Sequence, residues 1–187
     1  MTILLYENAI RTLRENKMEI LGTTCATDEQ IRRVEARLRL SLPPSYKQML
    51  SDFGALEFDT TEIYGWLSQG IDAKFTTNVV YATERARDDD RISRTMVPFL
   101  ASGYGPFFVM DCAEIGADGE AAIYEVSPGG HQKGIDRLAD SFGAFLSEEV
   151  DRVLQGRDDG WESGEEDLSS PPYSNGGYWK ERAKDFD

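Results

Sequence analysis

Side chains that could act as a nucleophile, a base or a metal ligand are few in this chain. The only histidine, His131, falls in a glycine-rich turn at residues 129–134, and the two cysteines, Cys25 and Cys112, are far apart in the sequence. Nucleophilic catalysis needs a base held beside a nucleophile, and structural zinc needs four ligands at characteristic spacing. Because a mobile turn holds an imidazole poorly, we expect His131 to be an ordinary surface residue. The sequence therefore predicts no catalytic set and no metal site.

Two glycine patterns have the outline of nucleotide-binding loops but lack the residues that such loops need. Gly129 and Gly134 have the spacing of a P-loop. However, Ile135 and Asp136 stand where a lysine and a serine or threonine would contact phosphate and magnesium. The Gly-x-Gly at residues 103–105 precedes a predicted strand, whereas a dinucleotide site would need a helix there. We therefore expect no cofactor.

Carboxylates are the remaining groups that could carry acid–base chemistry. Glycosidase-like hydrolysis needs two carboxyl groups about 5–9.5 Å apart in a cleft, and Asp59, Glu62 and Asp111 are the candidates. A carboxylate-based hydrolase is the weakest of the functions considered. The acidic run at residues 88–90 does not match the calcium-binding EF-hand loop, so we interpret it as solvated charge.

The most suggestive stretch combines aromatic and acidic residues at positions 58–66. It contains Asp59, Glu62, Tyr64 and Trp66. Protein interfaces favour tyrosine and tryptophan anchors, which argues for a binding surface. Alternatively, Tyr64 and Trp66 share one face of a strand, because side chains alternate with a period of two, and that face is part of the core. The sequence leaves both interpretations open.

The formal net charge of −14, from 34 acidic and 20 basic residues, restricts the partners. Nucleic acids and anionic membranes are disfavoured, because binding to phosphate normally rests on a basic patch. A basic protein, by contrast, would be attracted and would associate faster. We expect Glu84 and Asp88 to take part in this attraction together with the aromatic and acidic stretch. The alternative is that the excess acid only keeps the protein soluble.

Apolar periodicity, caps and turn residues predict an α+β fold. Helices are expected at residues 3–17, from Thr27 in a capping box with Gln30, at 44–53, from Asn78 to residue 87, and after Ser141. Strands are expected at residues 63–67, 97–101, 107–111 and 121–126. Together they form a single domain at residues 1–155, mainly an antiparallel sheet flanked by helices. An acidic, aromatic-bearing extension follows at residues 156–187, and we expect it to dock in part on the domain.

This order of elements and several motifs resemble the SUKH superfamily, the group of the fungal cell-wall assembly regulator Smi/Knr. The motifs are Leu-Pro-Pro-Ser-Tyr at residues 42–46, Val-Pro-Phe-Leu at 97–100 with Gly-Tyr-Gly at 103–105, and Ser-Phe-x-x-Phe-Leu at 141–146. The resemblance covers about residues 27–154. It implies an α+β sheet flanked by helices and no shared catalytic residues. It also implies a protein-binding role, since many bacterial members are immunity proteins against toxins, often nucleases, and others are regulatory.

The function expected from these observations is a non-enzymatic immunity protein that occludes a basic toxin stoichiometrically. A regulatory or scaffold protein of the Smi/Knr type is the main alternative. The N-terminus lacks a signal-peptide pattern and no apolar run reaches the ~18 residues of a membrane span, so a cytoplasmic protein is expected. The sequence predicts no particular oligomeric state. The expected partner-binding residues are Asp59, Glu62, Tyr64, Trp66, Glu84, Asp88 and Tyr104.

Overall fold

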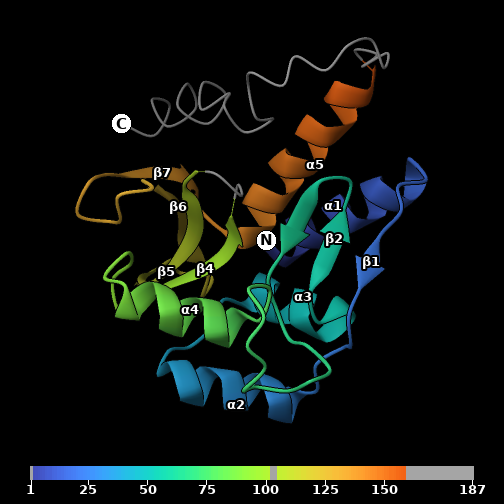
Figure 1. Cartoon of the computed structure of the whole chain (residues 1–187). Coiled ribbons are helices and arrows are strands. Elements are labelled where there is room, and N and C mark those ends of the chain that lie inside the picture. Colours follow the sequence, from blue (N-terminus) through green and yellow to red (C-terminus); the bar gives the residue numbers. More distant parts are fainter. Residues whose placement is uncertain (1, 102–104, 159–187) are drawn as a thin grey trace, which may run out of the picture.

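The computed structural model describes residues 2–101 and 105–158, which form five helices and two antiparallel sheets (Figure 1). This is the expected α+β class. The elements run α1 (Thr2–Glu15), β1 (Leu21–Gly22), α2 (Asp28–Leu38), α3 (Pro44–Phe53), β2 (Leu56–Phe58), β3 (Thr61–Ile63), α4 (Val79–Asp88), β4 (Met96–Ala101), β5 (Phe107–Ile115), β6 (Ala121–Val126), β7 (Ile135–Ala139) and α5 (Phe142–Asp158).

Side-chain caps fix where three of the helices begin. Thr27 and Gln30 form the predicted capping box of α2, in which each side chain bonds the other residue's backbone N–H. The side-chain oxygen of Asn78 accepts two N–H groups from the first turn of α4. Ser141 accepts the Ala144 N–H in the first turn of α5. These three predicted starts are confirmed.

The two sheets have the strand orders β1-β2-β3 and β4-β5-β6-β7, and all pairings are antiparallel. They meet at an irregularity in β4, where the register shifts between Pro98 and Leu100. At this point the Phe99 carbonyl accepts the N–H of Tyr64, at 2.8 Å, from the chain that follows β3. Pro98 lies in an outer strand of its sheet, as its missing N–H requires.

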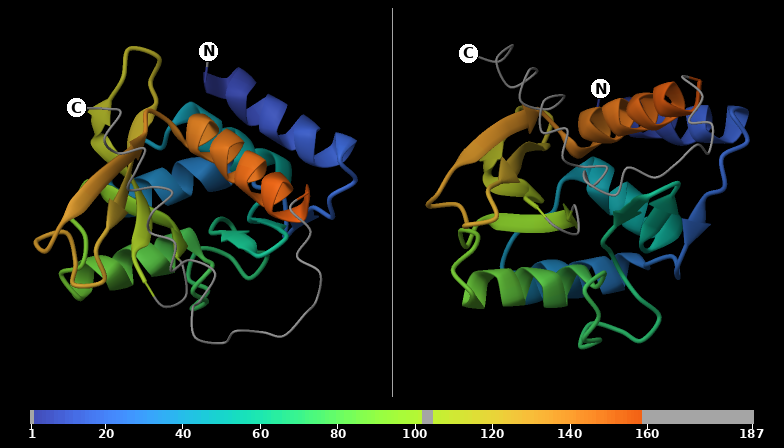
Figure 2. Two further views of the ribbon diagram at one scale, coloured as in Figure 1. Left: turned by 90° about the horizontal axis from the view of Figure 1, so that it is seen from above. Right: turned by 45° about the horizontal axis from the view of Figure 1, so that its top comes forward.

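Both faces of the larger sheet carry buried apolar side chains, although the start of β7 and the end of β5 are exposed. On one face, Phe108 of β5 and Phe99 of β4 contact the aromatic rings of α5, and α1 lies alongside α5 (Figure 2). On the other face, Val109 packs in a second apolar cluster with Ala86 of α4. α2 lies beside α4 (Figure 1). Among the described residues, no helix combines the length and apolar character needed to cross a bilayer.

Several strand boundaries differ from the sequence prediction. The strand expected at residues 63–67 is wrong: only Ile63 belongs to a strand, β3, because the chain then leaves the sheet and Gly65 forms an isolated bridge with Asn78. The loop expected at residues 113–120 is shorter, because β5 continues to Ile115. β1, β2 and β7 were not predicted as strands; the first two contain only two and three residues.

Candidate functional site

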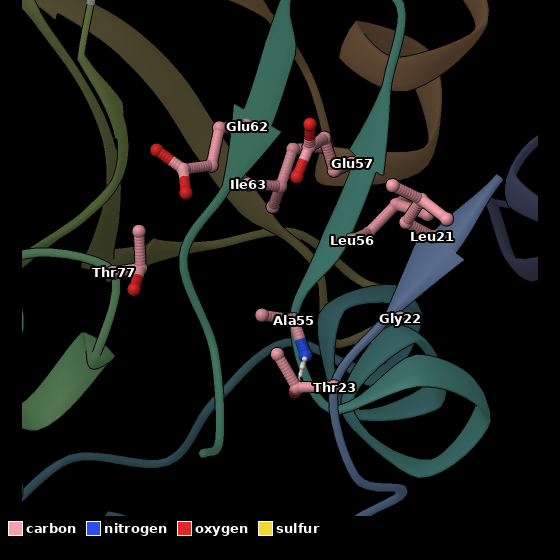
Figure 3. A pocket seen from close by; sticks show the side chains of 9 residues that line it. All are labelled: Leu21, Gly22, Thr23, Ala55, Leu56, Glu57, Glu62, Ile63 and Thr77. Atoms are coloured by element: carbon pink, nitrogen blue, oxygen red, sulfur yellow. Dashed lines mark hydrogen bonds between the residues drawn. The ribbon is translucent and has the colours of Figure 1, made fainter.

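The outer side of the small sheet carries a row of side chains that the pairing places next to one another. Leu21 of β1 is opposite Glu57 of β2, and Glu57 is opposite Glu62 of β3 (Figure 3). The row faces outward because the residues on either side of Glu57 and Glu62 point into the core, as strand alternation requires. Asp59 lies in the turn between β2 and β3, with a φ of 51°.

We call these residues, together with the adjacent Glu19, the acidic face: Glu19, Leu21, Glu57, Asp59 and Glu62. Two hollows lie on it. A small one of about 70 Å³ has Leu21, Glu57 and Glu62 in its wall. A larger one of about 250 Å³ has Glu19, Asp59 and the end of α5 in its wall. Leu21 is 48% exposed, so the acidic face offers apolar area beside its carboxylates.

The central carboxylates of the acidic face have no ion-pair partner among the described residues. Like charges directly opposite each other in an antiparallel pair destabilise the sheet, and Glu57 and Glu62 are such a pair. Burial, and then the Glu57 carboxylate, raise the pKa of Glu62 above its ordinary value. Within the described part of the chain, no ion pair engages Glu57, Asp59 or Glu62. Arg157 borders the face, and its guanidinium donates a hydrogen bond to the Met18 sulfur.

Glu84 and Asp88, expected to act with this stretch, lie on α4 and not on the acidic face. Glu84 is paired with Arg37 of α2 at 2.5 Å. Asp88 is exposed and borders a separate pocket of about 450 Å³, which Arg87 and His131 also line. The structure therefore brings Asp59 and Glu62 together with Glu57 and separates them from the two α4 carboxylates.

Tyr64 and Trp66 lie in the core. They are 8% and 5% exposed, so their burial favours the interpretation as core residues over the interpretation as interface anchors. The Tyr46 hydroxyl donates a 2.6 Å hydrogen bond to the Tyr64 carbonyl. Burial, and then the charge of Glu62, raise the pKa of Tyr64 to about 12. Tyr104, the remaining expected binding residue, lies outside the described residues.

The glycine-rich turn at residues 129–134 is held more firmly than its composition suggests. The backbone N–H of His131 donates to the Arg91 carbonyl at 2.8 Å, and the Gln132 amide donates to Asp90 at 2.8 Å. His131 is consequently half-buried instead of fully exposed. Of the carboxylates considered for hydrolysis, Asp111 lies on β5 in the other sheet, where it accepts the Ala113 N–H. In residues 2–101 and 105–158, no group of three or more His, Cys, Asp or Glu is arranged to hold a metal.

Glu57, Leu21 and Glu19 were not among the residues expected from sequence. The alternation Leu56-Glu57-Phe58 is a period-two signal that indicates an outward Glu57, although a strand of three residues is too short to identify by itself. Leu21 carries no such signal. It reaches the face only because β1 pairs with β2, which is 35 positions later in the chain.

Comparison with known proteins agrees with this architecture. The family model described as SMI1-KNR4 cell-wall (SUKH_6) matches residues 28–146, from the first turn of α2 to the first turns of α5. No curated protein matches the chain. The matched region contains the acidic hairpin β2–β3 and the whole of the larger sheet, and it confirms the resemblance noted in the motifs. The chain belongs to the SMI1-KNR4 cell-wall family, within the SUKH superfamily.

Proposed function

We propose that this protein is a non-catalytic immunity protein of the cytoplasm, which neutralises a basic, nuclease-like toxin by stoichiometric binding. The observation that carries the proposal is the acidic face, where Glu57 and Glu62 repel each other and neither forms an ion pair with any described residue. A fold gains no stability from such a pair. A cationic partner would convert the repulsion into attraction.

Binding would combine electrostatic attraction with burial of apolar area. The net charge of −14 attracts a basic protein from a distance, and the acidic face provides the local charges at which it docks. Exposed Leu21 and the two hollows beside it offer area that a partner side chain could exclude from water. The toxin would be neutralised because the bound immunity protein covers its working surface.

The acidic face is a better candidate than the α4 carboxylates, because Glu84 is already neutralised by Arg37. Tyr64 and Trp66 would act indirectly in this proposal. Their burial fixes the chain that follows β3 and so helps to hold Glu62 in position. Asp88 and Tyr104 stay predicted binding residues outside this interface, because Asp88 lies on α4 beside another pocket and Tyr104 lies outside the described residues.

The proposal is tested by binding and protection assays with a toxin encoded by a neighbouring gene. Coexpression of the chain should restore growth of cells that make the toxin. The double variant Glu57→Gln/Glu62→Gln should slow association about three- to tenfold at low salt, and the difference should shrink at high salt. The matched control Glu7→Gln/Asp136→Asn changes the net charge equally at exposed sites on α1 and β7, and should associate at the wild-type rate.

Two results would contradict the proposal. One is an equal decrease of the association rate in both double variants. Such a result would mean that total charge, and not the acidic face, sets the rate. The other is an absence of binding and protection with the neighbouring toxin. In that case the second candidate, a regulatory protein that binds a cellular partner, is favoured by the cell-wall description of the matched family. Turnover of a substrate, abolished by one Asp or Glu substitution, would instead favour a hydrolase.

A further inference from the structure

The point at which the chain leaves the described domain lies beside the acidic face. α5 ends at Asp158, and Arg157 in its last turn lines the 250 Å³ hollow together with Glu57 and Asp59. The Arg157 guanidinium also contacts Met18, which precedes Glu19 of the face. Residues that follow Asp158 therefore start next to the acidic carboxylates, whatever course they take afterwards.

The sequence after Asp158 divides into two parts of opposite charge. Residues 159–177 contain five acidic residues and no basic ones. Residues 178–184 contain two aromatic residues, Tyr178 and Trp179, and all the basic residues that follow Arg157: Lys180, Arg182 and Lys184. With one glutamate among them, residues 178–184 form the only cationic stretch in this part of the chain.

We propose that residues 178–184 bind the acidic face of their own chain and compete there with the partner protein. Charge complementarity selects this stretch, because the acidic residues 159–177 would be repelled by Glu57, Asp59 and Glu62. Lys180, Arg182 and Lys184 would supply the cations that the Glu57–Glu62 pair does not find among the described residues. Tyr178 and Trp179 supply apolar area for exposed Leu21.

The connection is long enough for this contact. The nineteen residues 159–177 can extend to about 60 Å, well beyond the dimensions of the adjacent hollow. A contact between two parts of one chain has an effective concentration on the order of millimolar. An intrinsic affinity as weak as millimolar therefore suffices to occupy the face about half of the time.

Internal competition would regulate the binding proposed above. The apparent affinity for a partner falls in proportion to the fraction of molecules whose face is free. Half occupancy would lower it about twofold, and tighter docking would lower it further. A basic toxin with high affinity would displace the segment, whereas weakly basic proteins would be excluded. This competition rests on the proposed binding of a basic partner to the acidic face, whether or not that partner is a toxin.

The test uses the full chain alone, so its failure is separable from failure of the toxin assay. A carbodiimide joins a carboxylate to an amine only where the two are in contact. At low salt we expect cross-linked peptides that connect Lys180 or Lys184 to Glu19, Glu57, Asp59 or Glu62. The cross-linked products should migrate as monomers in denaturing electrophoresis, and their yield should not depend on protein concentration. Products only between molecules, or only to carboxylates elsewhere, would overturn the inference.

A second measurement does not depend on the cross-linked groups. Trypsin cleaves after Lys180, Arg182 and Lys184, and docking should protect these bonds. Glu57→Gln/Glu62→Gln should raise their cleavage rate at least twofold under native conditions, whereas Glu7→Gln/Asp136→Asn should leave it unchanged. A melting temperature of the double variant no lower than that of the wild type excludes unfolding as the cause. Equal cleavage rates in wild type and both variants would overturn the inference.

Discussion

The hydroxyl of Thr61 donates a 2.6 Å hydrogen bond to the carboxylate of Glu149, which joins the β2–β3 hairpin to α5. Both residues are buried, and Glu149 is only 1% exposed. Its charge is balanced by Arg152, one turn further along α5, at 2.6 Å. The acidic hairpin is therefore fastened to α5 by a buried, paired carboxylate.

Glu149→Ala should lower the free energy of unfolding by about 1–3 kcal/mol, because it leaves the buried Thr61 hydroxyl without its acceptor. Asp151→Ala, at an exposed position two residues away, should change it by less than about 0.5 kcal/mol. Urea denaturation at neutral pH measures both. Equal effects would mean that the contact does not stabilise the hairpin.

Glu57→Gln should raise stability at pH 7 by about 0.2–1 kcal/mol, since it removes the cross-strand repulsion with Glu62. The gain should depend on pH. The pKa of Glu62 is raised in the folded state, so the folded protein binds more protons than the unfolded chain near and above the ordinary value of 4.5. Acidification through this range therefore relieves the repulsion in the wild type.

The stability difference between Glu57→Gln and wild type should accordingly be largest near pH 7 and vanish below about pH 4. Denaturant titrations at several pH values give the curve. A gain that persists unchanged in acid would show that the substitution acts through something other than the Glu62 charge. The same variant should bind the proposed partner more weakly, so stability and binding are expected to change in opposite directions.

Gly65→Ala should destabilise the fold by at least about 1–3 kcal/mol, because an added Cβ would lie 1.9 Å from the Gly54 carbonyl oxygen. Gly156 is a matched control on α5, where an added Cβ meets no atom within 4 Å. Gly156→Ala should instead stabilise the protein by up to about 0.5–1 kcal/mol through helix propensity. Thermal melts of the two variants should thus shift in opposite directions.

Tyr46→Phe should cost about 1–3 kcal/mol, because it deprives the buried Tyr64 carbonyl of its hydrogen-bond donor. Tyr81→Phe, at a half-buried position on α4, should change stability by less than about 0.5 kcal/mol. Chemical denaturation compares the two. If Tyr46→Phe were as stable as wild type, the position of the chain after β3 would not depend on this bond.

The helices were predictable because their signals are local. The Thr27 capping box, Asn78 and Ser141 each act within one helical turn, and the apolar period of each helix is visible in its own sequence. The short strands were not predictable in the same way. β1 and β2 contain two and three residues, and they are strands only because distant segments pair with them.

The candidate site was predictable in part for the same reason. Asp59 and Glu62 are near each other in the sequence and share the acidic face. Glu84 forms an ion pair with Arg37, 47 positions earlier, which no local pattern indicates. Large aromatic residues such as Tyr64 and Trp66 occur both in interfaces and in cores, so their sequence pattern fits either place. Both are buried in the complete fold.

The packing of α1 against α5 has a consequence for folding during synthesis. α1 approaches α5 so closely that a Cβ on Gly143 would lie 2.4 Å from the Thr2 carbonyl oxygen. The apolar side of α1, with Tyr6 and Leu13, contacts α3 as well, but it meets most of its packing surface only once α5 has been translated. At about 5–20 residues per second, the ribosome needs on the order of ten seconds for the intervening chain. Throughout that interval α3 can cover only part of the apolar side of α1, and the rest of it would stay exposed on the nascent chain.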